Sequence, residues 1–463
     1  MWHVFRQYLA FRKFGTIAIE HMGLVCCVLG AIEIRLLQEH YSFREFDYPF
    51  LKAVVFGLVF QYCLHLRDVY DFRKTYTSAH FFGRLAQALF AAVVVLSILY
   101  YSFPSSILEP SVFALSLLLG SVFLTLWHIL LRFYFDVRAP HTNLLVIGTG
   151  RLARELVSEI LRHPEMGMKI CGFVDDDPAL LNVSVVNPKV VGASADLPKV
   201  VNDYGVDQIV VELEDRRGKL PIHELLSMKM RGVGIEEATA VYEKVTGKIA
   251  LENLKPSWMI FNAGFSASRS MLVHKRILSV VLSTLLLLVF SPVILLFMAL
   301  IRLDSKGPIF FGQERVGQDD KVFTLWKFRS MRDKAEQESG PVWAAANDDR
   351  VTRVGKILRR TRMDELPQLW NVLCGDMSLV GPRPERPCFI KELAALIPFY
   401  HLRHSVKPGV TGWAQINYRY GSSVRDAVEK LQYDLFYIKH MSWLLDFVIV
   451  FETVKTVLVR KGS

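Results

Sequence analysis

The stretch ILSVVLSTLLLLVFSPVILLFMALI, residues 277–301, decides the fold because it runs for 25 residues without a charge. A helix needs about 20 apolar residues to cross a bilayer, so this segment is long enough to span one. Ser291 and Pro292 fall just past its middle. Proline removes a backbone donor and clashes with the preceding helical turn. The sequence therefore predicts a sharp break at Ser291-Pro292.

Two membrane topologies are compatible with this segment. The helix either crosses the membrane with a kink, or enters, turns at the break and leaves on the same face. Length alone favours crossing. Lys275 and Arg276 before the segment and Arg302 after it favour a return to one face, because basic flanks stay cytoplasmic. The hydrophilic, basic region that follows also needs cytosolic nucleotides, so we expect a re-entrant helix over 277–301.

Four further apolar segments fill the first third of the chain, at roughly 16–35, 50–66, 85–103 and 111–131. Each is near the length of a membrane-spanning helix. Basic residues cluster before the first, between the second and third, and after the fourth, whereas the loop 104–110 has none. The positive-inside rule then predicts a four-helix transmembrane bundle over 1–138. Its N-terminus and all that follows the bundle are expected on the cytoplasmic side of the membrane.

Composition agrees with membrane segments joined to water-facing domains. The chain has 463 residues, of which 52% are hydrophobic and 22% charged, and its mean hydropathy is +0.27. This length predicts two or three domains. The net charge of +10 suits nucleic acid, anionic lipid or phosphorylated substrates. Six cysteines without a C-x-x-C pair suggest free thiols and neither a disulfide framework nor a cysteine zinc site.

The stretch NLLVIGTGRLARELVSEIL, 143–161, reads as a strand, a glycine turn and an amphipathic helix. Further strand-like segments follow, so we expect a Rossmann-like α/β domain over 141–240 and a linker over 241–266. Gly148, Gly150 and Asp175 are the candidate nucleotide-binding residues of a G-x-G-x-x-A fingerprint. A scaffold whose glycines only make the turn fits equally well. No Tyr-x-x-x-Lys pair occurs between 141 and 265, which argues against epimerase or short-chain dehydrogenase chemistry.

The stretch RMDELPQLWNV, 362–372, ends a basic run with two acids and a proline. Its apolar residues have helical spacing, and Pro367 fits only a first helical turn, so we expect a helix over 365–373 with Asp364 as its N-cap. A carboxylate there lies beside free N–H groups that also attract phosphate. Ionised carboxylates are nucleophiles toward phosphorus, and Glu365 would point elsewhere as base or orienter. On this string alone, a structural cap remains the simpler interpretation.

Other strings in 304–434 carry phosphate-type chemistry. Lys327 and Arg329 in KFRSM lie two apart on an extended segment, and so on one face. Arg383 stands between two prolines, where a stiff turn fixes a bidentate fork. Gln415, a further candidate substrate-binding residue, lies in a loop bent by glycine and proline. The run 350–362 predicts a basic amphipathic helix for anionic lipid, and 433–451 predicts one amphipathic to apolar helix.

Six ordered strings together resemble the bacterial sugar transferases, the polyprenyl-phosphate hexose-1-phosphate transferases also called monotopic phosphoglycosyl transferases. The strings are DSKGPIFFGQERVG (304–317), KFRSM (327–331), DELPQLWNVL (364–373), DMSLVGPRP (376–384), KPGVTGWAQ (407–415) and YDLFYI (433–438). The resemblance covers 267–463, which it marks as the catalytic domain, of mainly α (α+β) class. The two domains before it resemble those of the long family members, and the linker is similar to a subgroup associated with exopolysaccharide assembly.

The resemblance implies a mechanism. Asp364 would attack the sugar-bearing phosphate of a UDP-sugar, expel UMP and hold a phosphosugar ester, which polyprenyl (undecaprenyl) phosphate then accepts. Glu365 completes the family's dyad, and Mg²⁺ is implied on the diphosphate and on Asp364. Arg383 would hold a phosphate, and Lys327 and Arg329 are weaker candidates for the same role. The re-entrant helix of the family maps onto 277–301, with its break at Pro292.

Other classes of function stay open at this stage. The Rossmann-like domain could make the chain a membrane-anchored nucleotide-sugar epimerase or dehydratase, or it could regulate the transferase as a sensor or dimerisation module. The expected partners are a UDP-sugar, polyprenyl phosphate, membrane lipids and, as a plausible state, a second copy of the chain, with no nucleic acid. No string in the sequence indicates which sugar the UDP-sugar carries.

Overall fold

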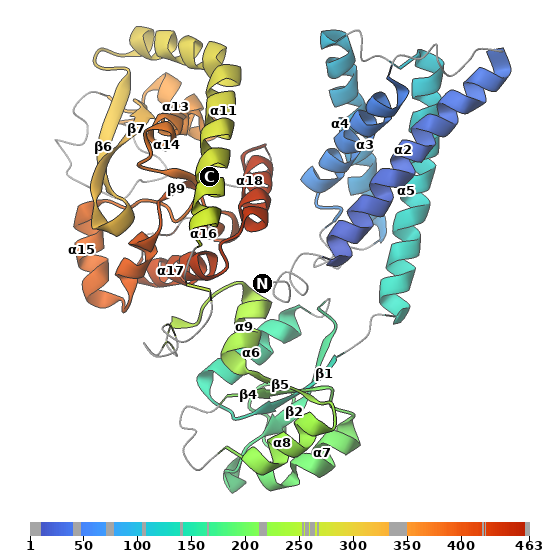
Figure 1. The fold of residues 1–463 in the computed structure, drawn as a ribbon, viewed down its shortest axis with the longest axis vertical. Coiled ribbons are helices and arrows are strands. Elements are labelled where there is room, and N and C mark those ends of the chain that lie inside the picture. The colour runs from blue at the N-terminus through green and yellow to red at the C-terminus, as the bar shows by residue number, and fades with distance from the viewer. Residues whose placement is uncertain are drawn as a thin grey trace. The chain divides into compact units, whose positions relative to one another are not determined.

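The protein forms two compact units, Met1–Thr246 and Gly247–Ser463, which are described separately (Figure 1). The computed structural model describes residues 11–39, 48–70, 78–103, 108–138, 142–163, 166–212, 220–251, 254, 259, 264–265, 268–332, 350–418, 421 and 423–458. Much of the predicted linker 241–266, namely 252–253, 255–258, 260–263 and 266, lies outside these residues. The helix α9 (Ala238–Thr246) crosses the predicted domain boundary at 240.

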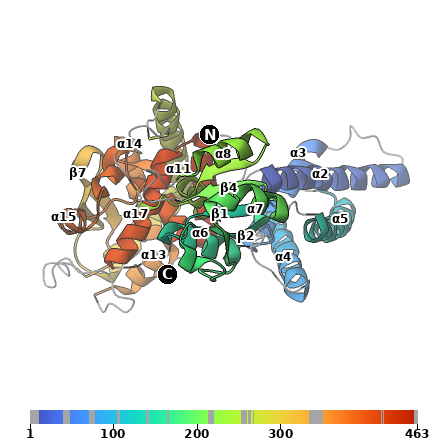
Figure 2. The ribbon, with the colours of Figure 1, turned by 90° about the horizontal axis from the view of Figure 1, so that it is seen from below.

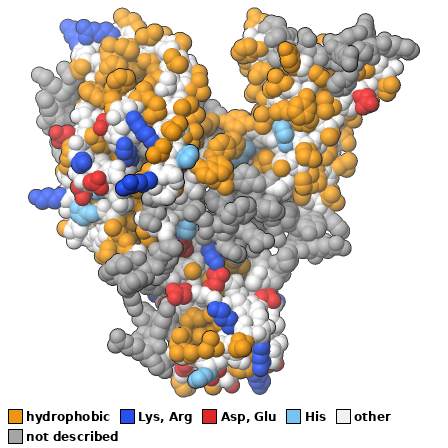
Figure 3. All heavy atoms as spheres, in the orientation of Figure 1, with side chains coloured by type: hydrophobic (Ala, Val, Ile, Leu, Met, Phe, Trp, Pro, Cys, Tyr) orange, Lys and Arg blue, Asp and Glu red, His pale blue; other side chains and the backbone are white. Residues whose placement is uncertain are grey.

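The first unit begins with helices α2 (Phe11–Glu39), α3 (Pro49–Leu66), α4 (Ser78–Ser102) and α5 (Pro110–Arg138). They share one apolar core, and α2 packs against both α3 and α5. Each contains a stretch long and apolar enough to cross a membrane. Hydrophobic side chains also gather on their outer surface, where lipid would replace water (Figure 3). These four helices match the four predicted apolar segments, and the chain is a membrane protein of several domains.

A five-stranded parallel sheet follows, with strand order β3-β2-β1-β4-β5. Its strands are β1 (Thr142–Ile147), β2 (Met168–Val174), β3 (Val190–Gly192), β4 (Gln208–Val211) and β5 (Gly234–Glu237). Helix α6 (Arg151–Arg162) contacts α9, and α7 (Leu197–Tyr204) contacts α8 (Ile222–Met230). Figure 1 shows the two pairs on opposite faces of the sheet, and short 3₁₀ turns occupy Pro178–Leu180 and Ser194–Asp196. This order is that of a doubly wound Rossmann-type sheet.

The second unit begins with α11 (Arg269–Asp304), a helix of 36 residues that contains Pro292. Among its residues only Ser279, Ser283 and Ile301 are buried, although most are apolar. Figure 1 shows the helix turning sharply toward its C-terminal end, and Ser291 Oγ donates to the Leu288 carbonyl at 2.7 Å. A serine bonded to the preceding turn and a proline both bend helices. The predicted break is therefore a bend within one helix.

The antiparallel hairpin of β6 (Phe310–Val316) and β7 (Val322–Phe328) follows α11, with a 3₁₀ turn at its tip, η7 (Gln318–Asp320). Next come α13 (Arg353–Thr361), the 3₁₀ turn η8 (Met363–Glu365) and α14 (Gln368–Cys374). Ile301, Phe328 and Leu358 form a small core against which Met363 and Leu366 pack. Figures 1 and 2 show α14 between the hairpin and α11, with which it makes contacts.

The rest of the unit surrounds a two-stranded parallel sheet, β8 (Ser378–Val380) with β9 (Gly409–Thr411). Its helices are α15 (Pro387–Leu396), the 3₁₀ helix η9 (Tyr400–Ser405), α16 (Trp413–Asn417), α17 (Val424–Lys439) and α18 (Trp443–Leu458). The prediction of one helix over 433–451 is wrong, because α17 ends at Lys439 and α18 begins at Trp443. Lys275 of α11 pairs with the buried Asp446 of α18 at 3.0 Å, and this ion pair fixes α18 against α11.

Two glycines of the sheet domain allow a matched test of the fold. Gly148 and Gly232 have φ of +95° and +93°, but a Cβ on Gly148 would lie 1.8 Å from the Glu212 carbonyl oxygen, whereas one on Gly232 meets nothing within 4 Å. We expect Gly232→Ala to cost about 1 kcal/mol, the strain of the left-handed backbone alone. Gly148→Ala should cost more than about 3 kcal/mol, because strand backbone must also move.

The measurement is the temperature at which the sheet domain of the purified chain becomes protease-sensitive. Equal losses in the two variants would show that the turn at Gly148 is not packed as described.

Candidate active site

Asp364 and Glu365 belong to η8, between the basic helix α13 and the short α14. The prediction that Asp364 caps a helix is wrong. Arg362 has a left-handed backbone (φ 59°) that ends α13, the next three residues form a single 3₁₀ turn, and Pro367 is the N-cap of α14. Pro367 fits there because the position needs no N–H donor. The helix itself occurs close to the predicted range.

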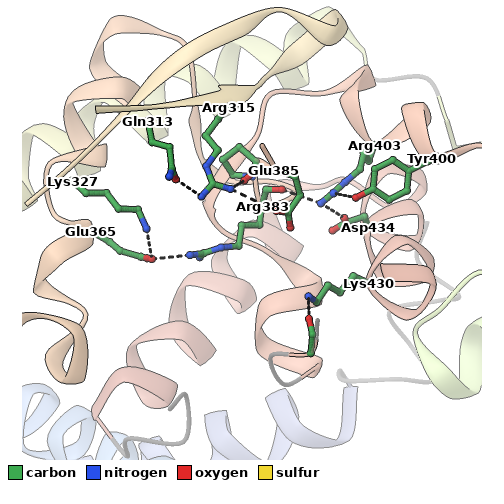
Figure 4. A network of polar contacts seen from close by, with 12 residues as sticks. Gln313, Arg315, Lys327, Glu365, Arg383, Glu385, Tyr400, Arg403, Lys430 and Asp434 are labelled. Carbon is green, nitrogen blue, oxygen red and sulfur yellow. Dashed lines mark hydrogen bonds and ion pairs between the residues drawn. The ribbon is translucent and has the colours of Figure 1, made fainter. Parts of the chain in front are cut away.

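Glu365 is held by two cations on one oxygen (Figure 4). Its Oε1 accepts from Arg383 Nη2 at 2.8 Å and from Lys327 Nζ at 3.3 Å. Lys327 comes from β7 and Arg383 from the loop after β8. Three of the predicted site residues, far apart in sequence, therefore meet at one carboxylate, whose side chain is 14% exposed.

Asp364 has a different environment. It is buried, with 9% of its surface exposed, yet its carboxylate accepts no hydrogen bond from any described residue. Burial and the neighbouring Glu365 raise its pKa, and Lys327, Arg359 and Arg362 oppose that rise. Burial also acts to raise the pKa of Glu365, but Arg383 and Lys327 outweigh it and hold that pKa well below the usual range. Adjacent acids with pKa values moved in opposite directions are typical of two different roles.

The loop that carries Arg383 is fixed from two sides. Gly381 N–H donates to the Thr411 carbonyl, and Gly409 N–H donates to the Pro382 carbonyl, both at 2.9 Å. A Cβ on Gly381 would lie 2.4 Å from the Lys407 carbonyl oxygen, so only glycine allows this approach to β9. On the other side, Arg315 of β6 donates to the Pro384 carbonyl at 3.0 Å. The arginine fork is therefore presented by a rigid loop.

A buried ion pair, Arg403 with Asp434, also supports this loop (Figure 4). Arg403 Nη2 donates to the Arg383 carbonyl and to Asp434 Oδ2, each at 2.9 Å, and Nη1 donates to Tyr400 Oη at 2.7 Å. Arg403 and Asp434 are 5% and 2% exposed. Burial raises the pKa of Asp434 to about 6, although Arg403 lowers it. Removing one partner of such a pair leaves an uncompensated buried charge, so Asp434 holds Arg403 in place. Because Arg403 also donates to the Arg383 carbonyl, we infer that the pair positions Arg383.

Helix α14 is held at its middle and at its C-terminus by polar side chains. Asn371 accepts from the Trp326 N–H at 3.0 Å and donates to the Thr324 carbonyl at 2.8 Å, which docks α14 on β7. At the C-terminus, Arg276 donates to the carbonyls of Val372 and Leu373, and Lys407 donates to that of Gly375 at 2.7 Å. Cations at this end satisfy the free carbonyls and the helix dipole. Sequence reasoning missed Asn371, Arg276 and Lys407.

Two of the predicted substrate-binding residues do not join Glu365. Arg329 is buried and donates to the Lys306 carbonyl and to both oxygens of Ser305, at the end of α11. Gln415 lies on α16 and donates to the Val410 carbonyl at 3.3 Å. Among the described residues, neither has a polar contact with Asp364 or Glu365. The structure thus places Lys327 and Arg383, and not Arg329 or Gln415, beside the dyad.

The glycine turn of the sheet domain is partly filled by the protein itself. Gly150 N–H, at the start of α6, donates to Glu212 Oε2 at 3.1 Å, and Glu212 is 7% exposed. Asp175, the candidate ribose-binding acid, accepts from Thr149 Oγ1 at 2.7 Å. A dinucleotide pyrophosphate would need the place that the Glu212 carboxylate takes at the start of α6. The arrangement favours the scaffold interpretation of Gly148, Gly150 and Asp175.

We therefore expect the purified chain to show no saturable NAD binding in calorimetric titration, because a fixed negative charge faces the helix N-terminus. Saturable NAD binding by the unchanged chain, lost in Gly150→Ala, would contradict this expectation.

Some signal for the missed residues does exist in the sequence. Asp434 is one charge within the apolar run YDLFYI, and an acid in such a run is buried only with a partner. The partner, Arg403, lies 31 residues earlier, and nothing in the sequence relates the two.

Comparison with known proteins agrees with this site. Residues 270–460 match the model of the bacterial sugar transferase family, and residues 65–226 match the model of a CoA-binding domain. The first match contains the dyad, Lys327, Arg383 and the whole Arg403 network.

Three curated relatives illustrate the similarity. The UDP-glucose:undecaprenyl-phosphate glucose-1-phosphate transferase of Escherichia coli (strain K12) is 35% identical over 69% of this chain and 68% of its own length. The UDP-N-acetylgalactosamine-undecaprenyl-phosphate N-acetylgalactosaminephosphotransferase of Aeromonas hydrophila is 41% identical, over 48% of this chain and 52% of its own length. The exopolysaccharide production protein PSS of Rhizobium leguminosarum bv. phaseoli is 43% identical, over 41% of this chain and 97% of its own. The chain thus aligns with only about half of the Aeromonas protein.

Proposed function

This chain belongs to the bacterial sugar transferase family, and from that membership we propose that it transfers a hexose-1-phosphate from a UDP-sugar to polyprenyl phosphate, releasing UMP. The acceptor would be undecaprenyl phosphate, which the names of the relatives carry. The observation that supports this reaction best is the pair of adjacent acids in unlike environments. Glu365 is held by Lys327 and Arg383, whereas Asp364 accepts no hydrogen bond from the described residues.

Asp364 is the proposed nucleophile. A carboxylate oxygen of Asp364 attacks the sugar-bearing phosphorus, the bond from that phosphorus to the bridging oxygen breaks, and UMP leaves with the electron pair. An oxygen of polyprenyl phosphate then attacks the same phosphorus, the bond to Asp364 breaks, and the free carboxylate returns. Its raised pKa makes the carboxylate more basic, and none of the described residues donates a hydrogen bond to it, which leaves an oxygen available.

Glu365 is the proposed orienter. Its lowered pKa makes it a weak base, because proton uptake would break both ion pairs. Instead it fixes the directions of Arg383 and Lys327. The two cations exceed the single negative charge of Glu365, so the cluster attracts the diphosphate of the donor.

The residues present fit the Mg²⁺ that the family implies. Mg²⁺ prefers oxygen ligands and is commonly held by one or two carboxylates together with substrate phosphates. Asp364 offers such an oxygen, without a hydrogen bond from the described residues. A bound Mg²⁺ would neutralise charge on the diphosphate.

The membrane side of the reaction rests on α11. Among its residues only Ser279, Ser283 and Ile301 are buried, and hydrophobic side chains gather on the surface of the unit (Figure 3). Its last turns pack on the core that Met363 and Leu366 also contact. A re-entrant path, with the catalytic unit on the cytoplasmic face of the inner membrane, would bring a lipid-linked phosphate and a cytosolic UDP-sugar to the same carboxylate. The product would begin the assembly of an exopolysaccharide or another glycoconjugate.

The nucleophile can be tested by Asp364→Asn, since an amide oxygen cannot form the ester. We expect UMP release to fall by at least about 10³-fold, and sugar-labelled UDP-sugar to leave no covalent label on the variant. The donors to screen are UDP-glucose and UDP-N-acetylgalactosamine, because the relatives differ in sugar.

Asp319→Asn, the same change at an exposed turn acid, is the control and should retain full activity. Full turnover by the Asp364→Asn enzyme would exclude this mechanism.

The pH profile offers a second test. Asp364 must be ionised to attack, so the rate falls as the pH drops through its raised pKa, giving an acid limb above that of an ordinary aspartate. The positive charge of Arg359 lowers this pKa, so Arg359→Gln should move the acid limb of kcat/KM to higher pH.

Arg360→Gln, an exposed neighbour on the same helix, is the matched control and should leave the limb in place. A limb that does not move in Arg359→Gln would assign it to another group.

A further inference from the structure

A cluster of two histidines and an aspartate lies outside the proposed active site. His401 and His404 belong to η9, and Asp320 belongs to the tip of the hairpin β6–β7. One ligand atom from each residue lies within 4.8 Å of the others. Among the described residues, this is the group of side chains suited to holding a metal ion.

Local backbone geometry brings these side chains together. A 3₁₀ helix has three residues per turn, so residues three apart, such as His401 and His404, project from the same side. Asp319 and Asp320 both have left-handed backbones, φ 55° and 58°, as a tight hairpin turn requires and as aspartate tolerates. Gln318 Nε2 donates to the Ser405 carbonyl at 3.3 Å, which docks the hairpin tip on η9.

The distances are close to those of a metal site. Asp320 Oδ1 lies 3.3 Å from His401 Nδ1 and 2.6 Å from His404 Nδ1. Bonds of about 2.0–2.2 Å in a tetrahedral zinc site place neighbouring ligand atoms about 3.4 Å apart. The His401 pair already has that separation, and the His404 pair would open by less than about 1 Å.

Exposure and ligand type are also suitable. His404 is 7% exposed, whereas Asp320 and His401 are 54% and 60% exposed, so one side of the cluster faces solvent and leaves an entry path. Two imidazole nitrogens and one carboxylate suit zinc-like ions, whereas Mg²⁺ prefers oxygen alone.

We propose that Asp320, His401 and His404 bind a divalent transition ion of the zinc type, which fastens the tip of hairpin β6–β7 to η9. The position matters because Arg403 lies between the two histidines and donates to the carbonyl of Arg383. The same hairpin carries Lys327. The ion would therefore stiffen both of the elements that supply cations to Glu365. This site is separate from the Mg²⁺ proposed on Asp364 and does not depend on the transfer reaction.

The test is a titration of the full chain, without a histidine tag and stripped with chelator, in detergent or nanodiscs. Co²⁺ reports its own coordination by visible absorption. We expect one equivalent to bind with the strong bands of low coordination and to be displaced by Zn²⁺. His401→Ala and Asp320→Asn should weaken binding at least about tenfold, since each removes one of the three protein ligands. Zn²⁺ should also raise the Tm of the unchanged chain and not that of His401→Ala.

Two controls match these changes. Asp319→Asn makes the same change at the neighbouring turn residue, and His223→Ala removes an exposed histidine in the sheet domain. Both should bind as the unchanged chain does. His401 is chosen over the buried His404 because its removal should leave the fold intact. No saturable binding, or equal binding in all four variants, would overturn the proposal.

Discussion

The attachment of Arg383 and Lys327 to the single carboxylate of Glu365 is the interaction on which the catalytic unit depends. A buried carboxylate without partners would be costly, and the two cations come from the hairpin and from the loop after β8. Each of these elements must therefore be held independently. Asn371 does this for the hairpin, and β9, Arg315 and Arg403 do it for the loop. The result is that two cations are held on one carboxylate, that of Glu365, directly beside Asp364.

Sequence reasoning predicted the elements around Asp364 and Glu365 better than the contacts between them. Pro367 and the short helix after it follow from local spacing, whereas the dyad is implied by the resemblance of the six strings to the family whose model matches 270–460. The predicted start of that helix is wrong, because the left-handed backbone of Arg362 turns the chain before the helix begins. Arg329 was paired with Lys327 by strand alternation, yet β7 ends at Phe328, so alternation no longer fixes its direction. The Arg403–Asp434 pair could not be predicted, because it depends on how η9 packs on α17.

The sheet domain shows a similar limit. A fingerprint of glycines predicts a tight turn before a helix, and Gly148 with φ +95° supplies it. What fills the space above the turn is decided by a residue 62 positions later, Glu212. The glycine motif therefore predicts the backbone geometry of the turn. It predicts a bound ligand only when no side chain fills the space above the turn.

The helix α11 joins an apolar, membrane-compatible surface to the proposed active site through packing as well as through the polar contacts of Lys275 and Arg276. Its exposed apolar side chains are stable only in lipid, whereas Ile301, Ile294 and Phe297 near its end belong to the core that contains Met363 and Leu366. These last two residues flank the dyad directly. Since packed cores transmit displacement, the depth of α11 in a bilayer would set the height of Asp364 above the lipid. A phosphate attached to a lipid chain is also held near the membrane surface, so the proposed transfer would need a matching depth of α11 as well as the charge of Asp364.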